Sequence, residues 1–149
     1  GKNEFFHLMP IYFELESFLV STRSSVDMLM HLLNYCLAYD IDNRQVSVSS
    51  LFHSGQLSKP LKDIFARYTT PYNNPTWSFI YLFRNEVVHE KSIFQALPIY
   101  FKDVLEHSFL YFRVDNTEKE VTDYLKVCLR FLDTFTDRVL SVLEVSLKQ

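Results

Sequence analysis

Glycine and proline are scarce in this sequence, which has two glycines and five prolines among its 149 residues. Loop-rich and low-complexity proteins contain far more of both, so these classes are excluded. Disorder is excluded too, because disordered chains have few aromatic residues and this one has 14 Phe and 9 Tyr. With 48% hydrophobic residues, a chain of this length can bury one sizeable core. We therefore expect a single domain over residues 1–149.

Positive charge, cysteine and long apolar runs are also in short supply. The formal net charge is −3, so no protein-wide positive field gathers nucleic acid, and any RNA contact has to be local. Cys36 and Cys128 are too few for a disulfide scaffold and lie at apolar helical positions, where we expect reduced thiols. No apolar run approaches the ~20 residues that span a bilayer, and no charged-then-apolar leader opens the chain. These absences favour a soluble, cytoplasmic protein with no membrane contact.

The first third of the chain carries a long helical pattern. Neither proline nor glycine occurs from residue 11 to about Tyr39, and Pro10 fits the first turn of a helix. One stripe repeats at steps of three and four, which keeps it on one face; it consists of Leu15, Leu19, Thr22, Val26, Leu29, Leu33 and Cys36.

A second long pattern ends the chain. Thr117 and Glu120 form a capping-box pattern ahead of a helix to about Lys148. Its stripe consists of Val121, Leu125, Cys128, Leu132, Phe135, Val139 and Val142. A second apolar line widens that face: Leu129, Leu140, Leu143 and Leu147. This line indicates either deeper burial within the same bundle or a dimer seam.

Shorter elements lie between the two long helices. Ser58 and Pro60 open a helix through Tyr68, and Asn74 and Pro75 are a plausible cap and first residue for a helix over about 76–91. Residues 99–114 are aromatic and branched enough for a small β-hairpin as an alternative to helix. The pattern as a whole predicts an all-α protein, an up-and-down bundle of four to five helices with long first and last helices.

The segment RNEVVHEK, residues 84–91, places three polar side chains inside an otherwise apolar helical pattern. Asn85 and His89 are four apart and share a helix face, so the carboxamide can orient the imidazole. The long side chain of Arg84 can reach the same cleft. A guanidinium for phosphate oxygens and an imidazole for proton transfer suit attack of a ribose 2′-OH on the neighbouring phosphate. That reaction needs no metal or other cofactor, and His7, His31, His53 and His107 lack the spacing of metal ligands.

Structural roles without catalysis stay open for several of these charged residues. Arg84 and its neighbours can form the solvated face of the helix, with His89 near its end, where a cation suits the helix dipole. Arg23 and Asp27, four apart in the first helix, are expected to pair with each other, and the functional alternative has them flanking the cleft. The cluster Lys59, Lys62 and Arg67 is expected to be a solvated face.

RNEVVH at residues 84–89 resembles the Arg-x4-His signature of the HEPN superfamily, with the usual polar residue after the arginine, and the expected bundle resembles the HEPN fold. The resemblance implies a metal-independent ribonuclease, active as a homodimer in which Arg84, Asn85 and His89 of both chains line one cleft. It also implies that an antitoxin or other regulatory protein is a candidate partner. HEPN toxins silenced by modification commonly carry a tyrosine two residues after the histidine, where this chain has Lys91, so that form of silencing is not expected. Many HEPN domains are non-catalytic bundles that bind a nucleotide or a partner protein, and this is the alternative function.

Overall fold

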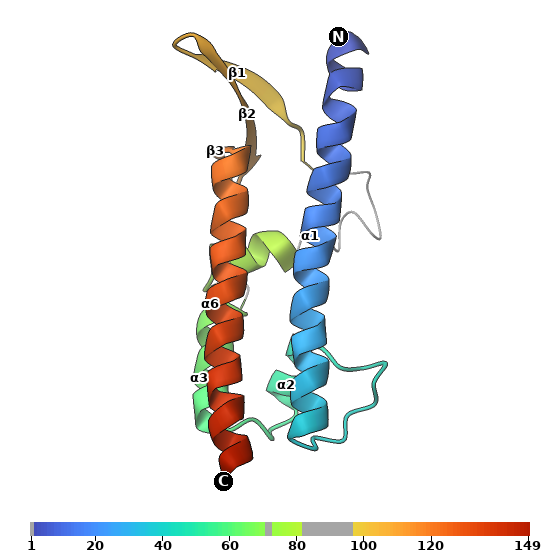
Figure 1. Cartoon of the computed structure of the whole chain (residues 1–149), viewed down its shortest axis with the longest axis vertical. Coiled ribbons are helices and arrows are strands. Elements are labelled where there is room, and N and C mark those ends of the chain that lie inside the picture. The colour runs from blue at the N-terminus through green and yellow to red at the C-terminus, as the bar shows by residue number, and fades with distance from the viewer. Residues whose placement is uncertain (1, 71–72, 82–96) are drawn as a thin grey trace.

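The computed structural model describes the backbone of residues 2–70, 73–81 and 97–149 and the side chains from residue 8 onward. Two long helices, α1 (Lys2–Cys36) and α6 (Val121–Lys148), lie side by side and run in the same direction (Figure 1). The shorter helices lie behind this pair in the view, and a small sheet stands at the end where α6 begins. The frame is therefore a layer of two long helices that is covered on one side.

The stripe expected on α1 is confirmed. Six of its seven positions are buried, and Cys36 is half-buried. The expected start is wrong, because the helix begins at Lys2 and continues through Pro10. Proline removes only one backbone donor from a helix, and a helix of 35 residues retains enough other hydrogen bonds and packing to tolerate it. The helix ends before Ala38, whose φ of 52° is left-handed.

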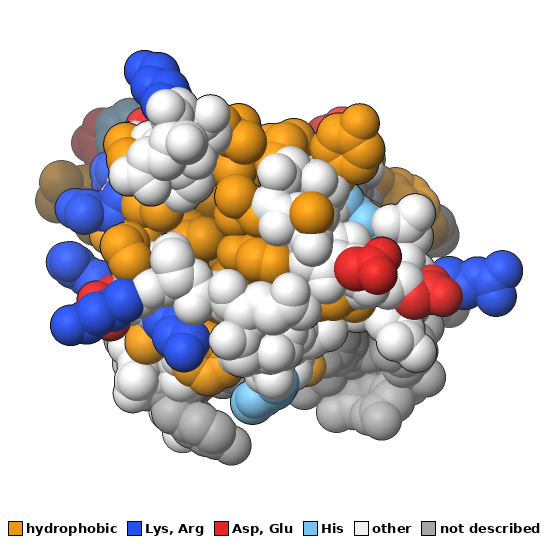
Figure 2. Space-filling model, turned by 90° about the horizontal axis from the view of Figure 1, so that it is seen from below, with side chains coloured by type: hydrophobic (Ala, Val, Ile, Leu, Met, Phe, Trp, Pro, Cys, Tyr) orange, Lys and Arg blue, Asp and Glu red, His pale blue; other side chains and the backbone are white. Residues whose placement is uncertain are grey.

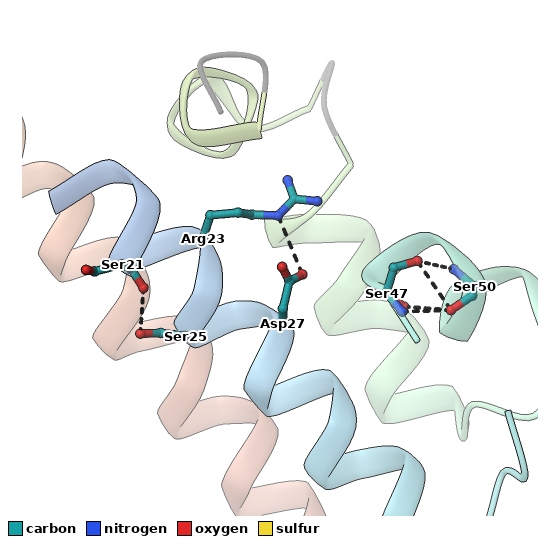
Figure 3. Close-up of polar contacts among 6 residues, drawn as sticks. All are labelled: Ser21, Arg23, Ser25, Asp27, Ser47 and Ser50. Carbon is teal, nitrogen blue, oxygen red and sulfur yellow. Dashed lines mark hydrogen bonds and ion pairs between the residues drawn. The ribbon is translucent and has the colours of Figure 1, made fainter. Parts of the chain in front are cut away.

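Two short helices follow α1. The helix α3 (Lys59–Tyr68) begins after Ser58, as expected, and the side chains of Lys59, Lys62 and Arg67 are exposed, which confirms the solvated face. The helix α2 (Val48–His53) was not expected. It is capped by Ser47 and Ser50, each of which accepts a hydrogen bond from the other's backbone N–H, at 3.0 and 2.8 Å (Figure 3). Ser50 occupies the position that is Glu or Gln in the usual capping box. The sequence pattern of that motif therefore does not predict this cap.

The cap expected at Asn74 is confirmed. A helix occupies residues 75–81, with Pro75 as its first residue. The backbone N–H of Trp77 donates to Asn74 Oδ1 at 3.1 Å, and that of Ser78 donates to the Asn74 carbonyl at 3.0 Å. These bonds satisfy donors that an uncapped helix start leaves without partners. Beyond residue 81, the expected extent of this helix lies outside the described residues.

Aromatic rings join the short helices to α6. Trp77 stacks on Phe131 with ring centroids 6.1 Å apart, and Phe131 stacks on Phe135 at the same distance. Phe65 of α3 meets Phe135 edge-on at 6.0 Å. Pairs of this geometry each contribute about 0.5–1.5 kcal/mol beyond simple burial. The core therefore fixes α3 and the helix of residues 75–81 on α6 through a small number of large side chains.

The expected all-α class is wrong, because the chain contains a three-stranded antiparallel sheet. Its strands are β1 (Tyr100–Val104), β2 (His107–Val114) and β3 (Thr117–Glu120), in that order. The hairpin considered at residues 99–114 corresponds to β1 and β2. The third strand pairs with β2 across a two-residue turn, Asp115–Asn116, whose φ values of 51° and 62° are both left-handed. Two left-handed residues match the right-handed twist of a hairpin, and Asp and Asn tolerate that conformation.

The capping box expected at Thr117 and Glu120 is also wrong. Thr117 pairs with Val114 in the sheet, and Glu120 itself is the cap of α6, accepting a hydrogen bond from the backbone N–H of Asp123 at 2.6 Å. Strand pairing takes up the backbone groups of residues 117–120, so the helix starts at Val121.

Among the described residues, the contacts between the sheet and the helices lie at one end of the sheet. Phe112 of β2 is fully buried and contacts Phe79 and Tyr124, with centroids 5.8 and 5.6 Å away. The backbone N–H of Ile99 donates to the Tyr12 hydroxyl of α1 at 2.6 Å. The far end of the hairpin is exposed, and Leu105 at its turn is 96% accessible.

The second apolar line of α6 divides between the core and the surface. Leu143 is buried, whereas Leu129, Leu140 and Leu147 are exposed. Together with Met28 and Leu32 of α1, Leu140 lines a shallow groove between the two long helices. Seen from the end where α6 finishes, hydrophobic side chains gather on the surface with Lys and Arg side chains along one edge (Figure 2). None of the helices in the described part of the chain is long and apolar enough to cross a membrane.

We expect Asn74→Ala to lower the free energy of unfolding by about 1 kcal/mol, because it removes the side-chain acceptor for the N–H of Trp77. Urea denaturation followed by circular dichroism measures this change. The matched control is Asn73→Ala, which alters an exposed neighbour and is expected to leave the unfolding free energy within about 0.5 kcal/mol of the parent. Equal effects of the two substitutions would contradict the assigned cap.

Candidate functional site

The three residues expected to carry the chemistry, Arg84, Asn85 and His89, lie outside the described residues. The structure does describe the helix that leads to them. Residues 75–81 are helical, Trp77 is 1% exposed, and Ile80 is fully buried. Tyr81, the last described residue of this capped, core-packed helix, is three residues before Arg84 in the sequence.

Arg23 of α1 lies against this helix. Its guanidinium carbon is 4.6 Å from the ring centroid of Tyr81 and 5.1 Å from that of Trp77. The residue is only 6% exposed, and a guanidinium stays protonated at any physiological pH. A cation over aromatic faces is attracted by their negative π clouds, at about 2 kcal/mol when desolvated. Arg23 thus connects α1 to the helix that precedes the motif.

The expected pairing of Arg23 with Asp27 is confirmed. Arg23 Nε lies 3.5 Å from Asp27 Oδ1, one helical turn along α1 (Figure 3). Figure 3 shows the Arg23 side chain reaching away from α1, with Asp27 on the same side of that helix. The carboxylate, 28% exposed, offsets part of the desolvation of the buried cation.

A cavity of about 350 Å³ opens beside Arg23. Four elements contribute to its wall: α1, the α2 segment, α3 with the residues that follow it, and the helix of residues 75–81. We call it the Arg23 pocket, and its wall includes Arg23, Ser49, Phe52, His53, Trp77 and Tyr81. Its volume falls in the range occupied by small-ligand sites.

Several polar groups in the pocket wall have structural partners. The Ser47 hydroxyl caps α2, and the Thr69 hydroxyl donates to the Phe65 carbonyl at 2.9 Å. Ser49 and His53 are exposed. Arg23 is the single Lys or Arg among the described residues of the wall, and no Asp or Glu is among them. The described wall therefore combines one buried cation, paired with Asp27, with aromatic rings and hydroxyl groups.

Cys128 is a poor candidate for a nucleophile. Cys128 is fully buried, and burial raises the pKa of its thiol to about 12, so almost no thiolate forms near neutral pH. Burial also raises the pKa of the Tyr124 hydroxyl beside it. Both cysteines are free thiols, as expected.

A polar cluster on the sheet is structural. Lys102 Nζ donates to one oxygen of Glu118 at 2.6 Å, and the Tyr100 hydroxyl donates to the other at 2.5 Å. Both bonds lower the pKa of the Glu118 carboxyl, and the bond from Lys102 has the larger effect. The cluster joins β1 to β3 across β2 on an exposed face. In the part of the chain that the structure describes, no three His, Cys, Asp or Glu side chains are grouped so as to hold a metal ion.

The sequence pointed to Arg23 as a candidate site residue, but it did not predict the residues that surround Arg23. Trp77 and Tyr81 fall inside a helix whose apolar residues all fit core packing, and Phe52 and His53 fall on a helix that was not expected. One signal was available: Trp77 is the chain's one tryptophan and comes two residues after a proline that opens a helix. A comparison of the chain with family models, curated proteins and solved structures finds no match.

Proposed function

We propose that this protein is a metal-independent endoribonuclease of the HEPN type that cleaves single-stranded RNA. The observation that carries the proposal is the sequence RNEVVH at residues 84–89. In the sequence it begins three residues after Tyr81, which belongs to a capped helix that packs in the core and contacts a buried arginine. A catalytic segment needs such a rigid support, because the position of its groups determines the rate.

Cleavage proceeds by attack of the ribose 2′-oxygen on the adjacent phosphorus. His89 accepts the 2′-OH proton, and Arg84 stabilises the negative charge on the phosphoryl oxygens. The bond from phosphorus to the 5′-oxygen of the next nucleotide breaks, and that oxygen takes a proton from a general acid. The products are a 2′,3′-cyclic phosphate and a 5′-hydroxyl end. Asn85 orients the His89 imidazole by hydrogen bonding.

A homodimer fits this chemistry, because the reaction uses a base and an acid and one chain supplies a single positioned histidine. Within the proposal, Arg84 and His89 of two copies line one cleft. The groove between α1 and α6 is a different surface. Leu32, in its wall, is nine residues from Arg23 and so half a turn around α1. A dimer formed through that groove would hold the two Arg23 pockets apart, so the composite cleft requires another face.

The sheet changes the expected architecture. It follows the motif in the chain and stands at the end of the bundle where α6 begins (Figure 1). The helical framework of α1, α3, residues 75–81 and α6 packs together without it. The alternative function, a non-catalytic bundle that binds a nucleotide, is favoured by one observation, the cationic and aromatic Arg23 pocket.

We expect the purified protein to cleave single-stranded RNA in the presence of a chelator and to leave 2′,3′-cyclic phosphate ends. His89→Ala is expected to lower the cleavage rate by at least about a hundredfold, since general acid–base catalysis supplies 10²–10⁴-fold. The matched control is His107→Ala, at an exposed position of β2, with a rate expected to equal that of the parent. Intact RNA after incubation with the folded parent protein would reject the nuclease and leave the binding alternative.

The composite cleft is tested by complementation. Arg84→Ala and His89→Ala chains, each inactive alone, are expected to regain part of the activity when co-expressed, because the cleft of a mixed dimer contains both an Arg84 and a His89, which neither single-variant dimer does. Its one histidine transfers only one of the two protons, so recovery is expected to be partial. Recovery of at least about tenfold above either single variant is well within the 10²–10⁴-fold that each group supplies. Two His89→Ala chains with different tags provide the control for co-expression. Absence of recovery in a preparation shown to contain mixed dimers would contradict a shared cleft.

A further inference from the structure

We propose that the groove between α1 and α6 binds an amphipathic helix of a partner protein, and that this helix carries basic side chains beside its apolar face. We call the surface the α1–α6 groove, and its apolar wall includes Met28, Leu32, Tyr35, Leu132 and Leu140. The inference goes beyond the proposed function and does not rest on it. None of the described residues of this groove lines the Arg23 pocket.

Large apolar side chains are exposed on both sides of the groove. On α1, Met28 is 71% exposed and Tyr35 is 86% exposed. On α6, Leu140 is exposed, as is Leu129 one to two turns above the leucine that lines the wall. Single exposed apolar residues are normal on a protein surface, but a contiguous set beside polar residues indicates an interaction site.

The exposed side chains of each helix share one face. Those of α1 follow one another at steps of four and three residues, at positions 28, 32 and 35, which keeps them in line. On α6, Leu129 and Leu147 are eleven and seven residues from Leu140, close to three turns and two turns. The α6 line covers 18 residues from 129 to 147, or about 27 Å of helix. Its length therefore matches a helical partner of several turns.

The shape of the surface also favours a helix over a small molecule. Small-molecule sites enclose most of the ligand surface, whereas this groove is shallow. The helices α1 and α6 lie side by side and run in the same direction (Figure 1). A third helix can place apolar side chains at every third or fourth position between them, as helix-binding grooves do.

The charges of the groove favour a basic partner. Asp133 and Asp137 belong to its wall and are exposed, and neither forms an ion pair with another residue in the described part of the chain. The described wall contains no Lys or Arg, and its one histidine is His31. Complementary charges across an interface determine the choice and orientation of the partner. The two carboxylates also disfavour RNA and anionic lipid as occupants.

A second copy of this chain fits the groove less well. In a twofold-symmetric dimer the same patch lies on both sides of the interface. The aspartates of two grooves would then meet without a lysine or arginine from either described wall. Like charges that face each other across an interface are unfavourable, so a different chain with basic side chains is the better occupant.

A model peptide tests this fit. It is a fluorescein-labelled helix of about 14 residues, or about 21 Å, with leucines at steps of three and four and lysines elsewhere. We expect saturable binding to the parent protein in fluorescence anisotropy. A peptide with glutamate in place of every lysine is expected to bind at least about tenfold more weakly, because its charges then repel those of the groove.

Apolar variants locate the peptide on the protein. Leu32→Gln and Leu140→Gln are each expected to weaken binding at least about fivefold, because each removes an apolar contact without changing the net charge. The matched control is Val145→Gln. Val145 is also exposed, but it is five residues from Leu140 and so about 140° around α6, and its replacement is expected to leave binding unchanged.

Charge variants test the basic character of the partner. Asp133→Asn combined with Asp137→Asn is expected to weaken binding of the lysine peptide at least about fivefold, through loss of complementary charge. The control is Asp63→Asn combined with Asp123→Asn, which changes the net charge equally at exposed positions outside the described wall. This control is expected to bind as the parent does. Since all four side chains are exposed, both double variants are expected to fold.

The outcomes decide between the occupants. Saturable binding of the lysine peptide that the groove variants weaken and the control variants retain supports the proposal. No binding of that peptide, or parent-like binding in the groove variants, overturns it. Sedimentation velocity tests the second copy: self-association of the parent that Leu140→Gln abolishes would assign the groove to another copy of the chain and would also overturn the proposal. None of these results depends on RNA cleavage, so the nuclease proposal is tested separately.

Discussion

The burial of a permanently charged guanidinium between α1 and the helix of residues 75–81 is the constraint on which the rest of the site depends. Taking an arginine out of water is unfavourable unless its surroundings compensate. Here the compensation comes from Asp27 on the same helix and from two ring faces on the neighbouring one. Since the rings contribute only while the two helices stay in register, the charge links the long helix to the segment that leads into RNEVVH.

Much of the helical frame could be predicted from the sequence, because it depends on periodicity and on caps of standard composition. The stripe of α1, the start of α3 at Ser58 and the cap at Asn74 belong to this class. The start of α1 could not be predicted from the sequence, because tertiary packing and not local preference decides whether a helix continues through Pro10. The third strand was missed because Thr117 and Glu120 fit a capping box equally well. The deciding signal is the left-handed pair Asp115–Asn116, which turns residues 117–120 back to pair with the strand just before them, β2.

The candidate site was predictable in its parts and not in its arrangement. The spacing of Arg23 and Asp27 on one helix predicts their contact, because four residues make about one turn. That Arg23 also meets Trp77 and Tyr81 depends on how two helices more than fifty residues apart in the chain pack together, and no local pattern carries that information. The same holds for the pocket, whose wall combines residues from four segments.

The central claim is that Arg23 holds the helix of residues 75–81 against α1, and a double-mutant cycle tests it most directly. The free energies of unfolding of the parent, Arg23→Met, Tyr81→Leu and the double variant would be measured by urea denaturation. We predict a coupling energy of about 1–2 kcal/mol, as for a desolvated cation on an aromatic ring. Pairing Tyr81→Leu with Arg67→Met should give additive effects, because Arg67 stacks on a different ring. Additivity within about 0.3 kcal/mol for Arg23 and Tyr81 would contradict the claim.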